Sequence, residues 1–422
     1  MTTLEIHDLG PLGDGIHRNG RERIFIERAL PGDVVEAKVQ KAPGGVFRGD
    51  ITRMVTPSPD RAAAPCPHYD VCGGCTLQHA SEVFYRAWKI ETVRGALRRA
   101  GLEPARWDAP VFLPAGTRRR ATFAAIKKGN TVTLGYFRRR SHQIADVAAC
   151  LVADSAVMTL RGKLSAALAP ILQDGKTADI FIQVLNGQLD VVVTGPVGKK
   201  GRPDLDVYEA APRLAESLWL NRLSWRAREH DEPEVLIERA PFVARFGVLS
   251  VPLPPLAFLQ PTQAGEDALV AAVMEMLPER GTFADLFSGC GTFAGAMLAR
   301  GTVDAYESLG PAVRALEKAR GPAPLNAHRR DLFREPLSAA EAKRYDAIVF
   351  DPPRAGAQEQ SQALALAASD VARIVGVSCN PITFARDARI LCDGGYTLDI
   401  VKIVDQFTWS HHVELVASFT KR

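Results

Sequence analysis

Three short segments in the last quarter of the chain carry reactive side chains directly after expected strands. They are Asp351-Pro352-Pro353-Arg354, Ser378-Cys379-Asn380-Pro381 and His411-His412-Val413-Glu414. Open α/β sheets place their ligands at the carboxyl ends of strands, so we expect these segments to lie close together. Cys379 precedes a proline-led helix, and a helix N-terminus lowers a thiol pKa and favours the nucleophilic thiolate. A single cysteine of this kind is more often inert than catalytic, so the clustering matters more than any one segment.

A glycine-containing loop follows the apolar strand expected at Phe283 to Phe287. In Ser288-Gly289-Cys290-Gly291-Thr292 the glycines allow a sharp turn and let a ligand lie against the start of a helix expected from about Phe293 to Arg300. Glu307 ends the next expected strand, where a carboxylate can accept hydrogen bonds from both ribose hydroxyls, and Asp331 follows the third. This arrangement is typical of nucleoside binding by methyltransferases and lacks the third glycine of a dinucleotide fingerprint. A purely structural turn is the alternative.

These residue types together fit methylation of a uracil ring at carbon 5. Carbon 5 is a weak nucleophile, so a thiolate must add to carbon 6, and a base must later remove the carbon 5 proton. Cys379 fits the first role and Glu414 the second, while Asp351 can hold the uracil edge or the cofactor amine. The alternatives are a half-buried surface carboxylate for Glu414 and a helix N-cap for Asp351. Cys290 and Cys392 are interpreted as packing residues.

The motifs in residues 250 to 422 resemble the catalytic domain of the RNA 5-methyluridine methyltransferase family. They stand in the family order: Phe258-Leu259-Gln260-Pro261, the loop from Asp285 to Phe293, Asp351-Pro352-Pro353-Arg354-Ala355-Gly356, Ser378-Cys379-Asn380-Pro381 and His412-Val413-Glu414. The resemblance implies S-adenosylmethionine as methyl donor, a nucleophile at Cys379 and a base at Glu414. It also implies cofactor contacts at Gln260, Phe287, Gly289, Glu307, Asp331 and Asp351. Family members commonly carry asparagine where this chain has Thr292 and Gln263, which leaves a contact by Thr292 open.

Four further cysteines could bind a metal. Cys66, Cys72 and Cys75 are spaced C-x5-C-x2-C, with Cys150 far downstream. Four thiolates can close a 4Fe-4S cluster or a tetrahedral zinc site, and structural zinc usually shows two close cysteine pairs, which are lacking here. The first three cysteines and their neighbours resemble the iron–sulfur segment of the 23S ribosomal RNA branch of the same family. The resemblance implies a 4Fe-4S cluster, with zinc or free thiols as alternatives.

The pattern of expected elements predicts a multidomain α/β protein. Residues 1–57 alternate short apolar runs with glycine turns, which predicts a small antiparallel barrel similar to the OB-like TRAM domain, an RNA-binding module. Residues 58–249 are expected to form a central β-rich iron–sulfur domain, in which Asn186-Gly187 predicts a type I′ hairpin turn. In residues 250–422 strands alternate with helices, which predicts a Rossmann-like, mostly parallel and doubly wound methyltransferase domain.

Basic residues concentrate between Val111 and Arg140, where there are eight Lys or Arg residues and no acid. Arg118-Arg119-Arg120 and Arg138-Arg139-Arg140, with aromatic residues between them, predict a phosphate-binding surface, and a merely solvated basic face is the alternative. RNA is therefore the expected partner, with a uridine in 23S ribosomal RNA as the expected target. A transfer RNA uridine is the nearest rival, and a non-catalytic RNA-binding iron–sulfur protein is a more distant one.

Composition and charge set broader limits. With 46% hydrophobic and 24% charged residues the chain can bury a large core, and a net charge of +4 is too small to identify a partner. Seven cysteines, an odd number, argue against a disulfide framework. No apolar run is long enough to span a bilayer and no signal peptide is evident, so we expect a cytoplasmic protein with no membrane partner and no obligate protein partner.

Overall fold

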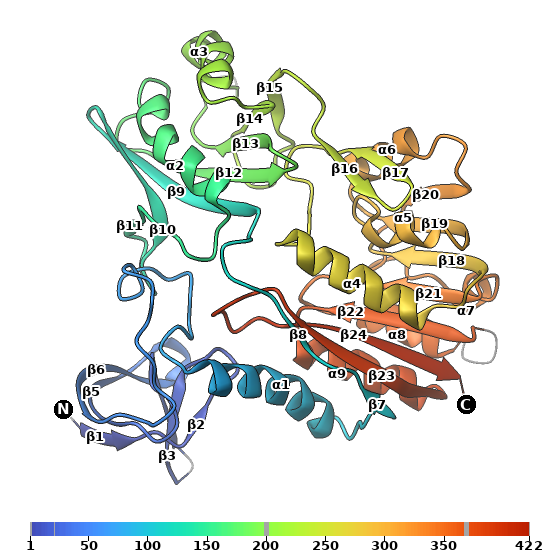
Figure 1. Cartoon of the computed structure of the whole chain (residues 1–422), viewed down its shortest axis with the longest axis horizontal. Helices are drawn as coiled ribbons and strands as arrows, with labels where there is room; N and C mark the ends of the chain where they lie inside the picture. The colour runs from blue at the N-terminus through green and yellow to red at the C-terminus, as the bar shows by residue number, and fades with distance from the viewer. Residues whose placement is uncertain (1, 21, 198–201, 367–370, 422) are drawn as a thin grey trace.

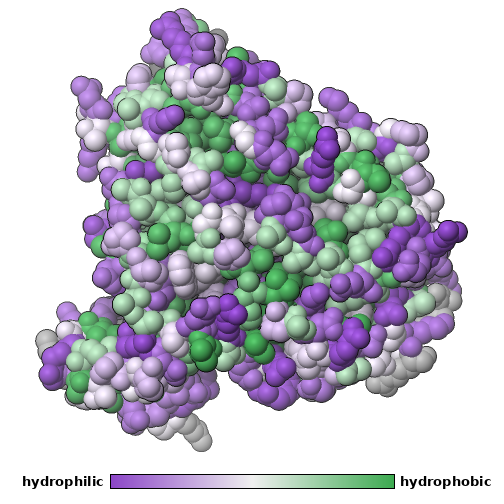
Figure 2. Space-filling view, viewed as in Figure 1, coloured by the Kyte–Doolittle hydropathy of each residue, from purple (hydrophilic) through white to green (hydrophobic). Residues whose placement is uncertain are grey.

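The computed structural model describes residues 2–20, 22–197, 202–366 and 371–421 (Figure 1). The strands in these ranges form three large sheets and one two-stranded hairpin. In Figure 2 the N-terminal sheet forms a lobe that projects from the rest of the molecule at the lower left.

The N-terminal sheet has six strands in the order β1-β5-β6-β4-β3-β2. Their bounds are Thr2–Glu5 (β1), Asp8–Leu9 (β2), Gly15–Asn19 (β3), Glu22–Ile26 (β4), Val34–Lys41 (β5) and Phe47–Thr56 (β6), with a 3-10 turn at Pro43–Gly45. The strands expected in this region are confirmed, but the expectation of purely antiparallel pairing is wrong because β4 and β6 run parallel. The buried side chains that hold this sheet together are few: Leu4, Ile6, Ile26, Ala29, Val35 and Ala37.

The segment after this sheet crosses to the C-terminal sheet. Helix α1 (Glu82–Arg99) begins at Ser81, whose hydroxyl accepts a hydrogen bond from the Phe84 N–H, and it packs against α9 and β23. Strands β7 (Arg106–Trp107) and β8 (Val111–Phe112) both pair with β23. Residues 82–112 therefore cover the C-terminal sheet before the chain enters the central one.

The central sheet has seven strands in the order β11-β10-β9-β12-β13-β14-β15. Their bounds are Arg120–Lys128 (β9), Thr131–Phe137 (β10), Ile144–Asp146 (β11), Thr177–Leu185 (β12), Gln188–Thr194 (β13), Arg222–Arg226 (β14) and Glu234–Glu238 (β15), with helices α2 (Ser155–Leu168) and α3 (Leu205–Ser217) packed on them. The predicted hairpin turn is confirmed, since Asn186 and Gly187 have φ angles of 51° and 77°. The hairpin of β16 (Val243–Phe246) and β17 (Leu249–Pro252) then leads to the last part of the chain.

The C-terminal sheet runs in the order β20-β19-β18-β21-β22-β24-β23-β7. Its remaining strands are β18 (Gly281–Leu286), β19 (Gly301–Glu307), β20 (Leu325–Arg329), β21 (Ala347–Phe350), β22 (Arg373–Ser378), β23 (Tyr396–Asp405) and β24 (Glu414–Lys421). The predicted mostly parallel sheet is confirmed, because β18 to β22 are parallel and only β24 runs antiparallel to its neighbours β22 and β23.

Helices cover both faces of this sheet, as a doubly wound fold requires. One face packs against α4 (Gln263–Met276), α5 (Thr292–Met297) and α6 (Gly310–Ala319). The other packs against α1, α7 (Ala339–Ala342), α8 (Gln358–Ala365) and α9 (Pro381–Asp393). The sheet is therefore buried on both faces, and its carboxyl-end edge is left to carry polar side chains.

Candidate active site

The predicted glycine loop connects β18 to α5. Phe287, Gly289 and Gly291 have φ angles of 62°, 53° and 90°. A Cβ atom at Gly291 would lie 2.5 Å from a Leu316 methyl carbon, so this turn requires glycine. The Gly289 N–H donates to Glu307 Oε2 over 3.0 Å, and the Ala294 N–H at the start of α5 donates to the buried Asp285 over 2.8 Å. The loop is thus held by the carboxyl of Asp285 on β18 and by that of Glu307 on β19.

The two acids predicted to contact the methyl donor lie at or just after the ends of the next two strands. Glu307 ends β19 and its Oε1 accepts the Leu309 N–H over 2.8 Å. Asp331 lies two residues after β20 and accepts the Phe333 N–H over 3.1 Å. The Phe333 ring packs against the Phe287 ring with centroids 5.4 Å apart. The fold therefore brings Phe287, Gly289, Glu307 and Asp331 to adjacent strand ends.

Cys379 follows β22, immediately before α9. Asn380 caps that helix by accepting the Ile382 N–H over 3.1 Å. The expected net lowering of the thiol pKa is wrong for this structure. Burial and the nearby carboxyls of Glu414 and Asp351 raise the pKa of Cys379 to about 11, while the charge and hydrogen bond of Arg354 oppose the rise.

Two carboxyls share this environment with the thiol. Glu414 is the buried first residue of β24, and burial followed by the charge of Asp351 raises its pKa to about 8. Burial raises the pKa of Asp351 to about 7. Both side chains therefore change protonation state near neutral pH, which suits groups that accept or hold a proton.

Three residues that the sequence did not single out also belong to this site. Arg354 Nη2 lies 2.9 Å from His412 Nε2, and burial lowers the pKa of His412 to about 3, so its neutral ring accepts this hydrogen bond. The Arg120 guanidinium stacks 4.2 Å from the centre of the Phe258 ring and carries its charge toward Glu414. Gln406 Nε2 donates to Gln260 Oε1 over 2.8 Å and lies 3.5 Å from Glu414 Oε1.

Little in the sequence could have identified these three residues. Arg354 and Arg120 stood inside motifs noted for other reasons, and the site lies at the junction of segments up to 294 positions apart, from Arg120 to Glu414. Gln406 carries no local signal, since only the pairing of β23 with β24 brings it beside Glu414.

The prediction that Arg118 to Arg120 form an exposed phosphate-binding surface is wrong at Arg119. This side chain is 5% exposed and forms an ion pair of 2.6 Å with Glu266 on α4. Its Nε also donates to the Gln260 carbonyl oxygen over 3.0 Å. The run of three arginines suggested solvent-facing charge because the sequence does not reveal that α4 covers its middle member.

The loop between β23 and Glu414 is anchored from two sides. Lys89 on α1 is fully buried, with its Nζ 2.8 Å from Asp405 Oδ1, and it also donates to the His412 carbonyl oxygen. The Trp409 carbonyl oxygen accepts hydrogen bonds from the N–H groups of Thr76 and Leu77 over 2.8 and 3.0 Å. Glu414 therefore follows a loop fixed by α1 and by the segment that carries Cys75.

The four predicted metal-binding cysteines lie near one another. The charges of Cys150, Cys72 and Cys66 all act on Cys75, whose pKa burial raises to about 12. The Ala149 N–H lies 3.4 Å from His68 Nε2, which brings the Cys150 segment to the first cysteine turn, and Arg139 donates to the carbonyl oxygen atoms of Cys72 and Cys75. Among the described residues, no group of three or more His, Cys, Asp or Glu side chains is arranged to hold a metal ion.

Within the described ranges, no helix combines the length and the apolar character that crossing a bilayer requires.

Known proteins resemble this chain over its whole length. It is 38% identical to an RNA methyltransferase of Caulobacter vibrioides, with both chains fully covered. It is 31% identical to the 23S rRNA (uracil(1939)-C(5))-methyltransferase of Pseudomonas putida, over 99% of this chain and 93% of that protein. The solved structure of Pyrococcus abyssi tRNA (uracil-54, C5)-methyltransferase with S-adenosyl-L-homocysteine has the same fold, with a TM-score of 0.78 and 22% identity over 99% of each chain.

The C-terminal part of the chain also matches a family model. Residues 327–422, which include Cys379 and Glu414, match the model described as tRNA (Uracil-5-)-methyltransferase. Full-length relatives and this match agree with the geometry of the thiol, the two carboxyls and the glycine loop. The chain belongs to the family of S-adenosylmethionine-dependent RNA (uracil-5-)-methyltransferases.

Proposed function

We propose that the protein methylates carbon 5 of a uridine in 23S ribosomal RNA through a covalent bond between Cys379 Sγ and carbon 6 of the ring. One observation carries this proposal. Cys379, Asp351 and Glu414 lie in one largely buried site, where both carboxyls act on the charge of the thiol. The Pseudomonas relative, named for a 23S rRNA uracil, supports the ribosomal target.

The proposed reaction has two stages. The Cys379 thiolate adds to carbon 6, and the electron pair moves toward carbon 5. Carbon 5 then bonds to the methyl group of the substrate S-adenosylmethionine as the bond from that methyl to sulfur breaks, which leaves S-adenosylhomocysteine. Glu414 then takes the proton from carbon 5, the double bond re-forms, and the bond from carbon 6 to sulfur breaks to release the thiolate. Arg354 stabilises the thiolate in both stages, because its charge and hydrogen bond lower the thiol pKa.

We assign the donor to the strand ends around the glycine loop. Glu307 and Asp331 would accept hydrogen bonds from the ribose and base, and Phe287 would offer an apolar surface. Gly289 would let the donor lie against the backbone, while Gln260 and Asp351 would hold its amino-acid end next to Cys379. These assignments follow the family motifs, and the adjacent strand ends support them.

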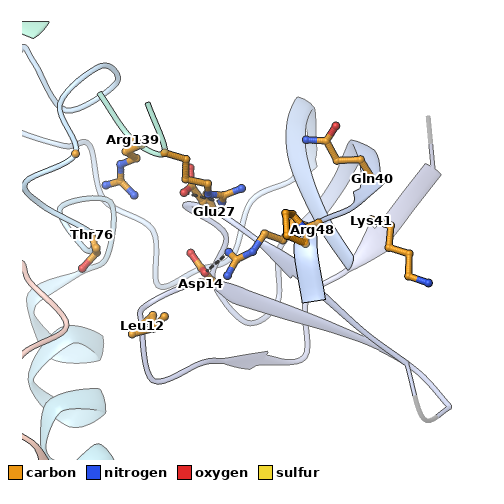
Figure 3. A pocket seen from close by; sticks show the side chains of 12 residues that line it. Leu12, Asp14, Glu27, Gln40, Lys41, Arg48, Thr76 and Arg139 are labelled. Atoms are coloured by element: carbon orange, nitrogen blue, oxygen red, sulfur yellow. Dashed lines mark hydrogen bonds and ion pairs between the residues drawn. The ribbon is translucent and has the colours of Figure 1, made fainter. Parts of the chain in front are cut away.

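We assign RNA binding to a cleft between the N-terminal sheet and the cysteine segment (Figure 3). The cleft has a volume of about 760 Å³, and four cations and two acids line it: Lys41, Arg48, Arg139, Arg140, Asp14 and Glu27. Arg48 pairs with Asp14 and Arg140 with Glu27, which leaves a net positive lining that suits a phosphate backbone. Because Arg119 is buried, we propose this cleft, and not the run from Arg118 to Arg120, as the path of the RNA.

We further propose that Cys66, Cys72, Cys75 and Cys150 hold a 4Fe-4S cluster. Their mutual charge interactions and the burial of Cys75 fit this group, since a cluster takes up thiolates that are otherwise costly to bury. When bound, the cluster would cross-link the two cysteine segments, and no step of the uracil reaction calls for a redox centre.

The covalent step makes the first prediction. Cys379→Ala should bind S-adenosylmethionine yet transfer no methyl group, whereas Glu414→Gln should stall with methylated RNA attached to Cys379. Denaturing gels of enzyme with labelled RNA, read beside a methyl-transfer assay, measure both outcomes. Cys392→Ala, on the buried face of α9, is the control and should behave as wild type. Appreciable turnover by Cys379→Ala would refute the mechanism, and loss of 5-methyluridine from transfer RNA rather than 23S ribosomal RNA in cells lacking the protein would refute the target.

The raised thiol pKa makes the second prediction. Because only the thiolate attacks, the rate of adduct formation with 5-fluorouridine RNA should rise as pH increases toward the Cys379 pKa of about 11. Arg354→Gln removes the group that lowers this pKa, so its rate profile should move to higher pH. Its rate at pH ~7 should then fall by roughly tenfold for every pH unit that the profile moves. Arg386→Gln, which removes a cation that pairs with Asp387 on α9, should leave the profile in place. A pH-independent rate would contradict this account.

The cysteine set makes the third prediction. Anaerobically purified protein should be brown and contain about four irons per chain. Cys150→Ser should lose iron and lower the melting temperature, while Cys290→Ser should keep its iron. Stoichiometric zinc without visible absorbance would overturn the cluster assignment.

The cleft makes the fourth prediction. Replacing Lys41 and Arg140 with glutamine should weaken RNA binding and flatten its salt dependence, since each lost phosphate contact removes about 0.7 to 0.9 from the log-log slope. A salt titration of RNA affinity measures the slope. Lys127→Gln with Lys128→Gln, at the end of β9 and outside the cleft, should leave it unchanged. Equal slopes for both double variants would place the RNA elsewhere.

A further inference from the structure

Arg119 stands where the central sheet meets the donor motif. Besides its ion pair with Glu266 and its bond to the Gln260 carbonyl oxygen, its Nη1 donates to Gln263 Oε1 over 2.5 Å. Its backbone N–H donates to the Pro261 carbonyl oxygen over 2.9 Å, and its carbonyl oxygen accepts the Val184 N–H over 2.8 Å. The guanidinium thus holds the backbone at Gln260 and the first turn of α4, while the backbone of Arg119 bonds to Pro261 on one side and to Val184 of β12 on the other.

The side chain of Gln260 continues this chain of contacts to the proposed base. Gln260 Oε1 accepts from Gln406 Nε2 over 2.8 Å, and that same Nε2 lies 3.5 Å from Glu414 Oε1. Space for the Gln406 amide exists because residue 265 is glycine, since a Cβ there would lie 2.1 Å from Gln406 Oε1. Gln260, Gln406 and Glu414 are all at most 5% exposed, so their relative positions have little freedom.

Gln263 completes the binding site for the guanidinium. Its Nε2 donates to Asp267 Oδ1 over 2.9 Å and lies 3.3 Å from Glu266 Oε1, while its Oε1 accepts from Arg119. An asparagine at this position would be one methylene shorter and would not reach both Arg119 and Asp267 from the backbone of α4. Arg119 and Gln263 therefore act as a matched pair in this chain.

We propose that Arg119 is a positioning residue that, through Gln260 and Gln406, sets both the methyl-donor site and the orientation of Glu414. The contact between the central sheet and α4 is then part of the catalytic apparatus and not only of the domain packing. This inference rests on the donor role proposed for Gln260 and the base role proposed for Glu414.

A buried arginine elsewhere in the same sheet offers a matched control. Arg222 is 3% exposed, pairs with Asp190 over 2.8 Å and donates to the Leu253 carbonyl oxygen over 2.7 Å. It therefore also ties the central sheet to the segment that precedes the donor motif, yet it contacts none of Gln260, Gln406 or Glu414. Arg222→Gln therefore shows the effect of losing a buried ion pair and hydrogen bond without a change at the proposed site.

The experiment compares Arg119→Gln, Arg119→Lys, Gln263→Asn and Arg222→Gln with the wild-type chain. It measures S-adenosylmethionine affinity by calorimetry, the fraction of enzyme held as methylated RNA adduct, and the melting temperature. Arg119→Gln should weaken donor affinity by about tenfold or more and increase the adduct fraction, because a buried charged donor is lost and Glu414 is misplaced. Arg119→Lys keeps the charge but loses the several N–H donors of the guanidinium, so it should show the same changes at smaller size. Gln263→Asn, which shortens the partner of Arg119, should do the same.

The outcomes separate positioning from packing. Arg222→Gln should lower the melting temperature without changing donor affinity or adduct fraction. If the Arg119 and Gln263 variants lower only the melting temperature, as Arg222→Gln does, the inference is wrong. If Arg119→Gln does not fold, Arg119→Lys and Gln263→Asn decide the matter alone. Failure of the wild-type chain to bind the donor or form an adduct would instead refute the proposed function.

Discussion

Burial of ionisable groups at the carboxyl edge of the C-terminal sheet is the constraint on which the rest of the structure depends. A thiol and two carboxyls share a largely buried space. Burial disfavours ionisation of all three, Asp351 further disfavours that of Glu414, and both carboxyls disfavour that of the thiol. The fold offsets this with cations that approach from different elements: Arg354 after β21 and Arg120 at the start of β9. The site is thus poised between charged and neutral forms, which is useful where protons and a thiolate must be exchanged within one reaction.

Several separate parts of the chain are needed to hold that balance. Helix α1 and the cysteine segment fix the loop that leads to Glu414, through Lys89 and through the carbonyl oxygen of Trp409. The central sheet supplies Arg120, whose charge acts on Glu414, and Arg119, which pairs with Glu266 in the first turn of α4. The reacting groups lie on the last sheet, but their surroundings also come from α1, the cysteine segment and the central sheet.

The sequence predicted those features that depend on neighbouring residues. The strand, glycine loop and helix around Gly289, and the turn at Asn186-Gly187, follow from backbone geometry that few residues permit. Cys379 follows a strand as expected, whereas Glu414, which was also expected directly after a strand, begins β24. What failed depends on distant packing. The burial of Arg119 is decided by α4, and the direction of the Cys379 pKa shift is decided by burial, Asp351 and Glu414 rather than by the adjacent helix. The parallel pairing of β4 with β6 likewise involves strands that are not neighbours in sequence.

The pairing of β7 and β8 with β23 has a consequence for how the polypeptide can be divided. These strands and α1 come from residues 82–112, yet they close an edge and a face of the C-terminal sheet (Figure 1). A fragment cut at residue 250 would contain all the reacting side chains, but its β23 would present bare backbone N–H and carbonyl groups, and α9 would expose apolar side chains that α1 normally covers. Open strand edges of this kind promote self-association. During synthesis, residues 82–112 leave the ribosome well before β23 is made. The edge of the catalytic sheet is therefore completed by a segment from the first third of the chain, which must wait for its partner strand.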